Sequence, residues 1–214
     1  MRIRKTRIAD KIFLLRFDSQ YAVASTFLRI QEHHESPTFR NRVFTLEQYM
    51  DWYAERFGAF TYYEDWSGFN VPSTAFEPFY KGVFDPLLRK EARLLRSFER
   101  ERSPFYVIGI ADEADLHHEV AHALYFTRAD YRKEVRRAMR AYDTTSLHKR
   151  LAPGYHRAVW PDEVHAYLAT PGSWLGRIPK RLQPLRRELR AIFRRHARAL
   201  NLLRSATRGG SESA

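Results

Sequence analysis

Hydrophobic and polar residues follow two spacings along this chain, and together they predict helices around a few strands. Two short apolar runs, Lys11–Phe17 and Phe105–Ile110, are typical of strands. One-sided apolar patterns predict helices at about Gln20–His34, Ala129–Tyr142 and Trp160–Thr170. The pattern therefore indicates an α+β fold, a mainly helical single domain with a small mixed β-sheet.

Capping signals mark two further helices. Thr45 and Gln48 form a capping-box pair, which predicts a helix that runs to Phe57 and ends near Gly58. Asp85-Pro86 resembles an N-cap followed by a proline in the first turn, so a helix is expected from there to about Glu101.

The segment between these two helices contains many aromatic residues. Ala59–Trp66 is predicted to be β-rich. Ser67–Thr74 contains Gly, Asn and Pro, which predicts a loop that packs on the core through Trp66 and Phe69.

Positive charge is concentrated near the C-terminus. The chain of 214 residues has a net charge of +12, and residues 177–208 alone hold eleven Lys and Arg against one acid. We therefore divide the chain into a domain at 1–176, a basic amphipathic helix at 177–205 that packs on or extends this domain, and a disordered tail at 206–214.

The composition also limits the chemistry. The chain has no cysteine, so any metal must be bound by histidines and carboxylates. No apolar run approaches the 18 residues of a membrane-spanning helix. The N-terminus is basic but lacks the apolar core and cleavage site of a secretory signal, so a cytoplasmic protein is expected.

The most specific pattern in the chain lies in a predicted helix at about Glu113–Phe126. His118-Glu119-Val120-Ala121-His122 has the form H-E-x-x-H. Residues four apart lie on one helix face, so both imidazoles can bind one zinc ion. Glu119 would lie near the open coordination position, where it can accept a proton from zinc-bound water.

A catalytic zinc usually has a third protein ligand. The downstream candidates are Glu134, Asp143, His148, His156, Asp162, Glu163 and His165. Glu134 lies in a basic stretch and is typical of a surface salt bridge. Glu163 begins a short helix with core-like residues, where a buried carboxylate needs a partner, so it is the preferred ligand.

Three features together, the strand Phe105–Ile110, the motif at 118–122 and Glu163, carry a resemblance to a known family. The chain resembles the gluzincin branch of the zincin metallopeptidases, and in size it is similar to the minimal gluzincins. The resemblance implies an edge strand, here Phe105–Ile110, that binds an extended peptide or protein substrate beside the active-site helix. It also implies Glu119 as general base and a Tyr or His that stabilises the oxyanion.

For that last role the candidates are Tyr155, His156, His165 and Tyr167, and Tyr155 and His156 rank first. Many family members carry an acid four residues after the glutamate ligand, where this chain has Tyr167. Asp162, Glu113 or Asp115 are the candidates to orient a zinc histidine in its place.

Three other interpretations stay open. The basic segment 177–208 could bind nucleic acid or another acidic partner. The loop Tyr62–Thr74 could occupy the cleft, with Glu64 or Asp65 as a fourth ligand of a non-catalytic or autoinhibited zinc site. Glu32-His33-His34-Glu35 is interpreted as a solvated helix end, because adjacent histidines point to different helix faces.

Overall fold

The computed structural model of the chain describes residues 3–171 and 175–200, and it confirms the α+β class. The strands are β1 (Ile3–Ala9), β2 (Ile12–Phe17), β3 (Gly68–Pro72) and β4 (Tyr106–Ile110). The α-helices are α1 (Gln20–Glu35), α2 (Leu46–Phe57), α3 (Tyr62–Asp65), α4 (Glu77–Tyr80), α5 (Arg89–Arg96), α6 (Leu116–Thr127), α7 (Ala129–Arg140), α8 (Thr145–Leu151), α9 (Trp160–Ala169) and α10 (Gln183–Ala199). Short 3₁₀ turns lie at Ser73–Phe76, Glu113–Asp115 and Lys180–Leu182.

The four strands form one mixed sheet in the order β1-β2-β4-β3. β2 and β4 are parallel, whereas β1 and β3 are antiparallel to their neighbours. All five residues of β4 are buried. This explains why β2 and β4 are continuous apolar runs, since such strands are covered on both faces.

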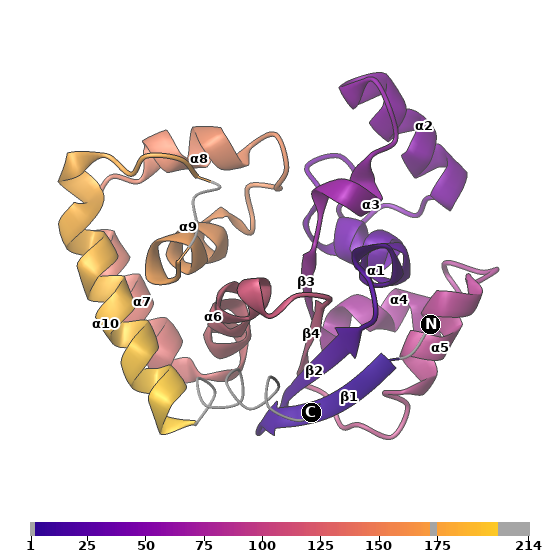
Figure 1. Ribbon diagram of the computed structural model, residues 1–214, viewed down its shortest axis with the longest axis horizontal. Coiled ribbons are helices and arrows are strands. Elements are labelled where there is room, and N and C mark those ends of the chain that lie inside the picture. The colour runs from indigo at the N-terminus through magenta and orange to yellow at the C-terminus, as the bar shows by residue number, and fades with distance from the viewer. Residues whose placement is uncertain (1–2, 172–174, 201–214) are drawn as a thin grey trace, which may run out of the picture.

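The sheet separates two hydrophobic cores. One core packs α6, α7, α9 and α10 against one face, and the other packs α1 to α5 against the opposite face. Figure 1 shows this arrangement, with α7 and α10 outermost on one side, α2 and α5 outermost on the other, and α1 next to the sheet. A helix close to the sheet needs a small residue beneath it, and Gly109 provides one: a Cβ atom there would lie 2.5 Å from the Phe27 ring of α1.

The expected edge strand is wrong. Phe105–Ile110 is an interior strand, because β4 pairs with β2 on one side and with β3 on the other. The two edge strands are β1 and β3, and β3 lies in the segment that was predicted to be a loop. Its Gly and Pro are tolerated because β3 is short, lies at an edge and ends at Pro72. Only the sheet partner reveals this strand, since its own sequence favours a turn.

Three local expectations are also corrected. The segment 59–66 is not β-rich, since it contains the short helix α3. The helix expected from Asp85 begins at Arg89 and ends at Arg96, and Glu91 accepts a hydrogen bond from the Leu88 N–H in place of an Asp85 cap. β1 was not predicted, because Arg4, Lys5 and Arg7 interrupt its apolar residues, and it is a strand through its pairing with β2.

The caps of α2 behave as the sequence predicts. Thr45 and Gln48 make both hydrogen bonds of the capping box, and Gly58 ends α2 in the left-handed conformation with a φ of 89°. α10 is amphipathic, and its apolar residues belong to the core that contains α6 and α9. The tail at 206–214 lies outside the described residues. Within the part of the chain that is described, no helix has the length and apolarity to cross a membrane.

Candidate metal centre

His118 and His122 lie on one face of α6, as their spacing predicts. Their Nε2 atoms are 3.1 Å apart. The helix is held in place by Leu116, Val120 and Leu124, which are buried in the core between α6 and the outer helices. The apolar face of the motif helix therefore fixes the direction of both imidazoles.

Glu163 reaches the same point from α9, which packs against α6. Its Oε1 atom is 3.6 Å from His122 Nε2, and its Oε2 atom is 3.9 Å from His118 Nε2. Ligand atoms at about 2.05 Å from a tetrahedral zinc ion are about 3.4 Å apart. His118, His122 and Glu163 are thus close to the spacing of three ligands of one ion, and together they form a group that could hold a metal.

The polar environment of Glu163 also fits a cation. Its side chain is 3% exposed, and Oε2 has no hydrogen-bond partner among the described residues. Burial raises the pKa of Glu163 to about 8. A buried carboxylate in this state is stabilised by a cation beside it, so the donor set and its surroundings fit a divalent metal.

Asp162 supports the second histidine. Its Oδ1 atom is 3.1 Å from His122 Nδ1, which leaves Nε2 of the imidazole directed at the other two ligand atoms. Burial opposes a charge on His122, but Asp162 and Glu163 outweigh it and raise its pKa to about 10. Of the three acids considered for this role, Asp162 contacts a histidine of the group, whereas Glu113 pairs with Arg16.

Glu119 is held by a residue of the edge strand. Asn70 Nδ2 donates a hydrogen bond of 2.6 Å to Glu119 Oε2, and Tyr106 donates to Asn70 Oδ1. The Glu119 side chain is 4% exposed and lines a cavity together with His118 and Glu163. One carboxylate oxygen is therefore fixed, beside the group that could hold a metal.

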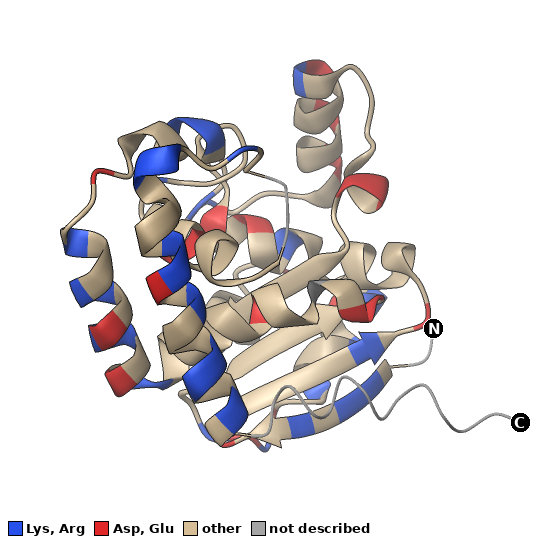
Figure 2. Ribbon diagram, turned by 60° about the vertical axis from the view of Figure 1, so that its left-hand side comes forward, with Lys and Arg blue, Asp and Glu red and all other residues tan. Residues whose placement is uncertain are grey.

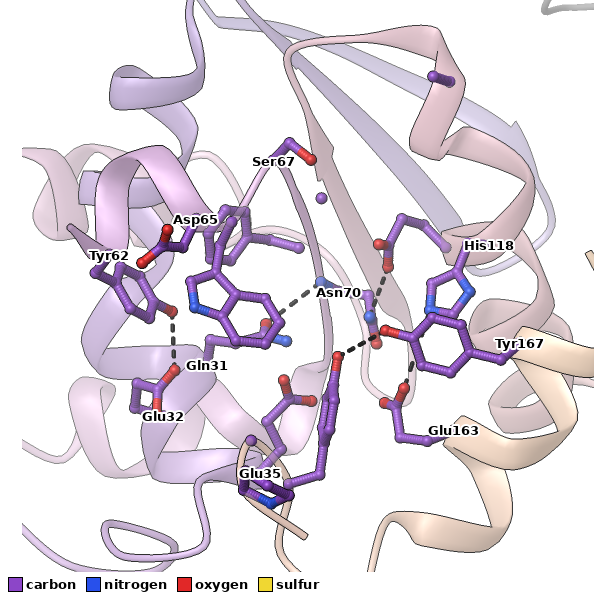
Figure 3. Close-up of a pocket in the computed structure, with 18 of the residues that line it drawn as sticks. Gln31, Glu32, Glu35, Tyr62, Asp65, Ser67, Asn70, His118, Glu163 and Tyr167 are labelled. Carbon is purple, nitrogen blue, oxygen red and sulfur yellow. Dashed lines mark hydrogen bonds and ion pairs between the residues drawn. The ribbon is translucent and has the colours of Figure 1, made fainter. Parts of the chain in front are cut away.

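The cavity has a volume of about 700 Å³. Its wall is formed by residues of α1, α2, α3, β3, α6 and α9 and of the segments that join them: Gln31, Glu32, Glu35, Tyr53, Phe57, Tyr62, Asp65, Trp66, Ser67, Gly68, Phe69, Asn70, Ala114, His118, Glu119, Pro153, Gly154, Tyr155, Glu163, Tyr167 and Pro171. Figure 3 shows the carboxylates of Glu32 and Glu35 on one side and His118 and Glu163 on the other. The edge strand β3 contributes main-chain atoms beside α6.

Two of the four candidates for oxyanion stabilisation line the cavity, and the other two do not. Tyr155 and Tyr167 line the cavity, and their hydroxyl groups are 3.1 Å apart. His156 does not line it; its main-chain N–H donates to Glu35 O and its Nδ1 accepts from the Ala158 N–H. His165 is buried elsewhere, between Tyr131 and the Asp162 carbonyl. The structure thus brings Tyr155 to the site and leaves His156 outside it.

Acids of the alternative interpretations have other partners. Asp65 accepts hydrogen bonds of 2.6 Å from Tyr53 and Thr61, and neither it nor Glu64 belongs to the candidate ligand group. Glu134 pairs with Arg195 and His196, as expected of a surface residue.

The interpretation of Glu32–Glu35 as a solvated helix end is wrong. Glu32 and Glu35 are 8% and 7% exposed, and both face the cavity. Sequence reasoning also missed Asn70, which lies in a stretch that favours a turn. The available signal for Glu32 and Glu35 was weak, since their spacing of three residues shows one helix face but not that the face is covered.

Comparison with protein-family models, curated proteins and solved structures gave no match to this chain. The resemblance to zincins therefore rests on the motif and on the His118, His122 and Glu163 group alone.

Proposed function

We propose that the protein is a zinc-dependent metallopeptidase. The observation that carries this proposal is the convergence of two histidines of one helix and a glutamate of another on one point, beside a buried glutamate and an open cavity. A His₂Glu donor set suits zinc in hydrolytic sites. When bound, the metal would polarise the substrate carbonyl and lower the pKa of a bound water molecule.

The residues of the chain supply the remaining chemistry. Glu119 accepts a proton from the attacking water and transfers it to the nitrogen of the leaving amine. The water oxygen bonds to the carbonyl carbon and the C=O bond electrons move to oxygen; the C–N bond then breaks as the amine nitrogen takes the proton, so a carboxylic acid and an amine are formed. The hydrogen bond from Asn70 to Glu119 Oε2 holds the carboxylate toward the cavity for this transfer.

Tyr155 or Tyr167 is placed to stabilise the negative charge that develops on the carbonyl oxygen. Burial raises the pKa of both hydroxyl groups well above the ordinary value, so both keep a proton to donate. An extended peptide would lie along the outer edge of β3, where the Asn70 N–H donates to Gln31 Oε1 in the free protein.

The experiment that tests this function is Glu119→Gln. The substitution keeps the size of the side chain but removes the base, so we expect kcat for peptide cleavage to fall by about 10²–10⁴-fold. Cleavage is measured by mass spectrometry on a library of synthetic decapeptides, with bound zinc determined on the same samples. Zinc content should stay at the wild-type level.

The matched control is Glu134→Gln, which alters a carboxylate that pairs with Arg195 on the surface. It should retain wild-type kcat. A zinc-loaded wild-type protein that cleaves no peptide of the library, or a Glu119→Gln variant that keeps both zinc and activity, would contradict the proposal.

A further inference from the structure

The cavity is acidic although the chain is strongly basic. Besides Glu119 and Glu163 it is lined by Glu32, Glu35 and Asp65, whereas no Lys or Arg of the described residues lines it. The net charge of the chain is +12. A cavity of the opposite sign to the rest of the molecule indicates a ligand with positive charge.

Glu32 and Glu35 lack the partner that buried carboxylates usually have. Neither forms an ion pair with a Lys or Arg in the described part of the chain, and Tyr62 donates a hydrogen bond of 2.9 Å to Glu32. Elsewhere the same helix does pair a buried acid: Arg29 Nε donates to Glu91 Oε1 at 2.7 Å. The fold thus pairs a buried carboxylate outside the cavity with an arginine and leaves Glu32 and Glu35 without a Lys or Arg among the described residues.

The pKa values of the same two carboxyl groups also favour a cationic ligand. Burial raises the pKa of Glu32 to about 7, and burial with the nearby charge of Glu163 raises that of Glu35 well above its ordinary value. Burial makes the ionised form of these carboxyl groups unfavourable, and a cation in the cavity would stabilise that form.

A further observation is independent of the acid count. Aromatic rings form part of the wall: Trp66 lies 5.9 Å from Tyr155 and 6.2 Å from Tyr62, centroid to centroid. Aromatic faces attract organic cations, which fit this wall better than a hydrated metal ion does.

A metal ion would not contact all the acids of the cavity. An ion held by His118, His122 and Glu163 would leave Glu32, Glu35 and Asp65 outside its ligand group. Among the described residues, that one group is placed to hold a metal. Glu35, on the helix opposite the ligands, is left for a different cation (Figure 3).

We propose that the wall formed by Glu32, Glu35 and the surrounding rings binds a cationic group of the substrate, an ammonium or guanidinium close to the bond that is cleaved. This inference rests on the proposed function for its placement in a substrate. The cation belongs to a Lys or Arg side chain or to the amino terminus of a peptide.

A binding experiment separates these sources and does not depend on catalysis. The probes are N-acetyl-argininamide, which is charged only in the side chain, norleucinamide, charged only at the α-amine, and N-acetyl-norleucinamide, which is uncharged. Affinity for the zinc-loaded full chain is measured by calorimetry, with wild type, Glu35→Gln and the control Glu47→Gln, whose side chain lies at the surface of α2.

We expect at least one charged probe to bind at least tenfold more tightly than the uncharged probe. This preference should be retained by Glu47→Gln and reduced to less than threefold by Glu35→Gln, while the zinc content of each variant stays the same. The probe that shows the preference identifies the source of the cation.

Equal affinity of all three probes for wild type would overturn the inference. So would a second metal ion per chain that is lost in Glu35→Gln, because the carboxylate would then bind metal. If the charged probes are preferred but no peptide is cleaved, the inference stands as a cation-binding cavity and the proposed peptidase function fails.

Discussion

The cavity and the outer helices of this protein carry opposite charge, although one basic chain forms both. Glu32, Glu35 and Glu163 are buried around the cavity, whereas α7 and α10 present rows of arginines to solvent (Figure 2). The comparison teaches that the net charge of +12 describes the solvated helices and says little about the site. The motif and the basic segment therefore concern different surfaces of the molecule.

The basic surface is built by helical spacing. One hollow on α7 is bordered by five basic residues, Arg132, Lys133, Arg136, Arg137 and Arg140. The two acids of α7 are engaged beside it, Asp130 with Arg128 and Glu134 with Arg195. No aromatic residue borders this hollow within the described chain, and stacking rings are what single-strand binding uses. A nucleic acid on this surface would be held through its phosphates and would have no aromatic ring on which to stack a base.

On the acidic side of this contrast, a large effect is expected from Asp162, which lies behind the cavity. Asp162→Asn removes the charge beside His122 Nδ1, so zinc affinity should fall by about 10–100-fold, as for other carboxylates that orient a metal-binding histidine. Competition with a fluorescent chelator measures it. Asp130→Asn, which alters an exposed acid, is the control and should bind zinc as wild type does. An Asp162→Asn affinity within twofold of wild type would show that the contact does not support the ligand.

A smaller effect tests whether the two regions act separately. A triple variant reverses the charge along the outer face of α7 by combining Lys133→Glu, Arg137→Glu and Arg140→Glu. We expect kcat/KM for a short neutral peptide to stay within twofold at about 0.15 M salt, because charges beyond about 8 Å are screened there.

The same triple variant should bind a single-stranded oligonucleotide more weakly than wild type. The slope of log affinity against log salt should become flatter by about 2, because three side chains that can neutralise phosphates have been replaced. A folded, zinc-loaded variant that no longer cleaves peptide would contradict the separation of the two regions.

The sequence predicted those features of the fold and the site that depend on residues close together in the chain. The capping box of α2, the buried strand β2 and the two histidines of α6 follow from spacing of a few residues, and they lie where expected. Glu163 was identified by a chemical argument, that a buried acid needs a partner, and the structure brings it to the histidines from a distant helix of the chain.

Features that depend on distant partners could not be predicted in this way. β3 is a strand because β4 pairs with it, although Gly68, Asn70 and Pro72 favour a turn. Glu32 and Glu35 are buried because α3 and the segment around Tyr155 cover that end of α1, which no periodicity of α1 encodes. The acidity of the cavity, and with it the contrast to the basic surface, becomes visible only once these segments lie together.

Zinc titration of metal-free protein tests the central claim most directly. Wild type, His122→Ala and Glu163→Ala are compared by calorimetry, with Glu134→Ala as a control for loss of a glutamate. The proposed centre predicts a single zinc ion per wild-type chain, the same for Glu134→Ala, and binding weaker by about 100-fold or more for each of the other two variants. Wild type that binds no zinc, or a Glu163→Ala variant that binds it as tightly as wild type, would contradict the account.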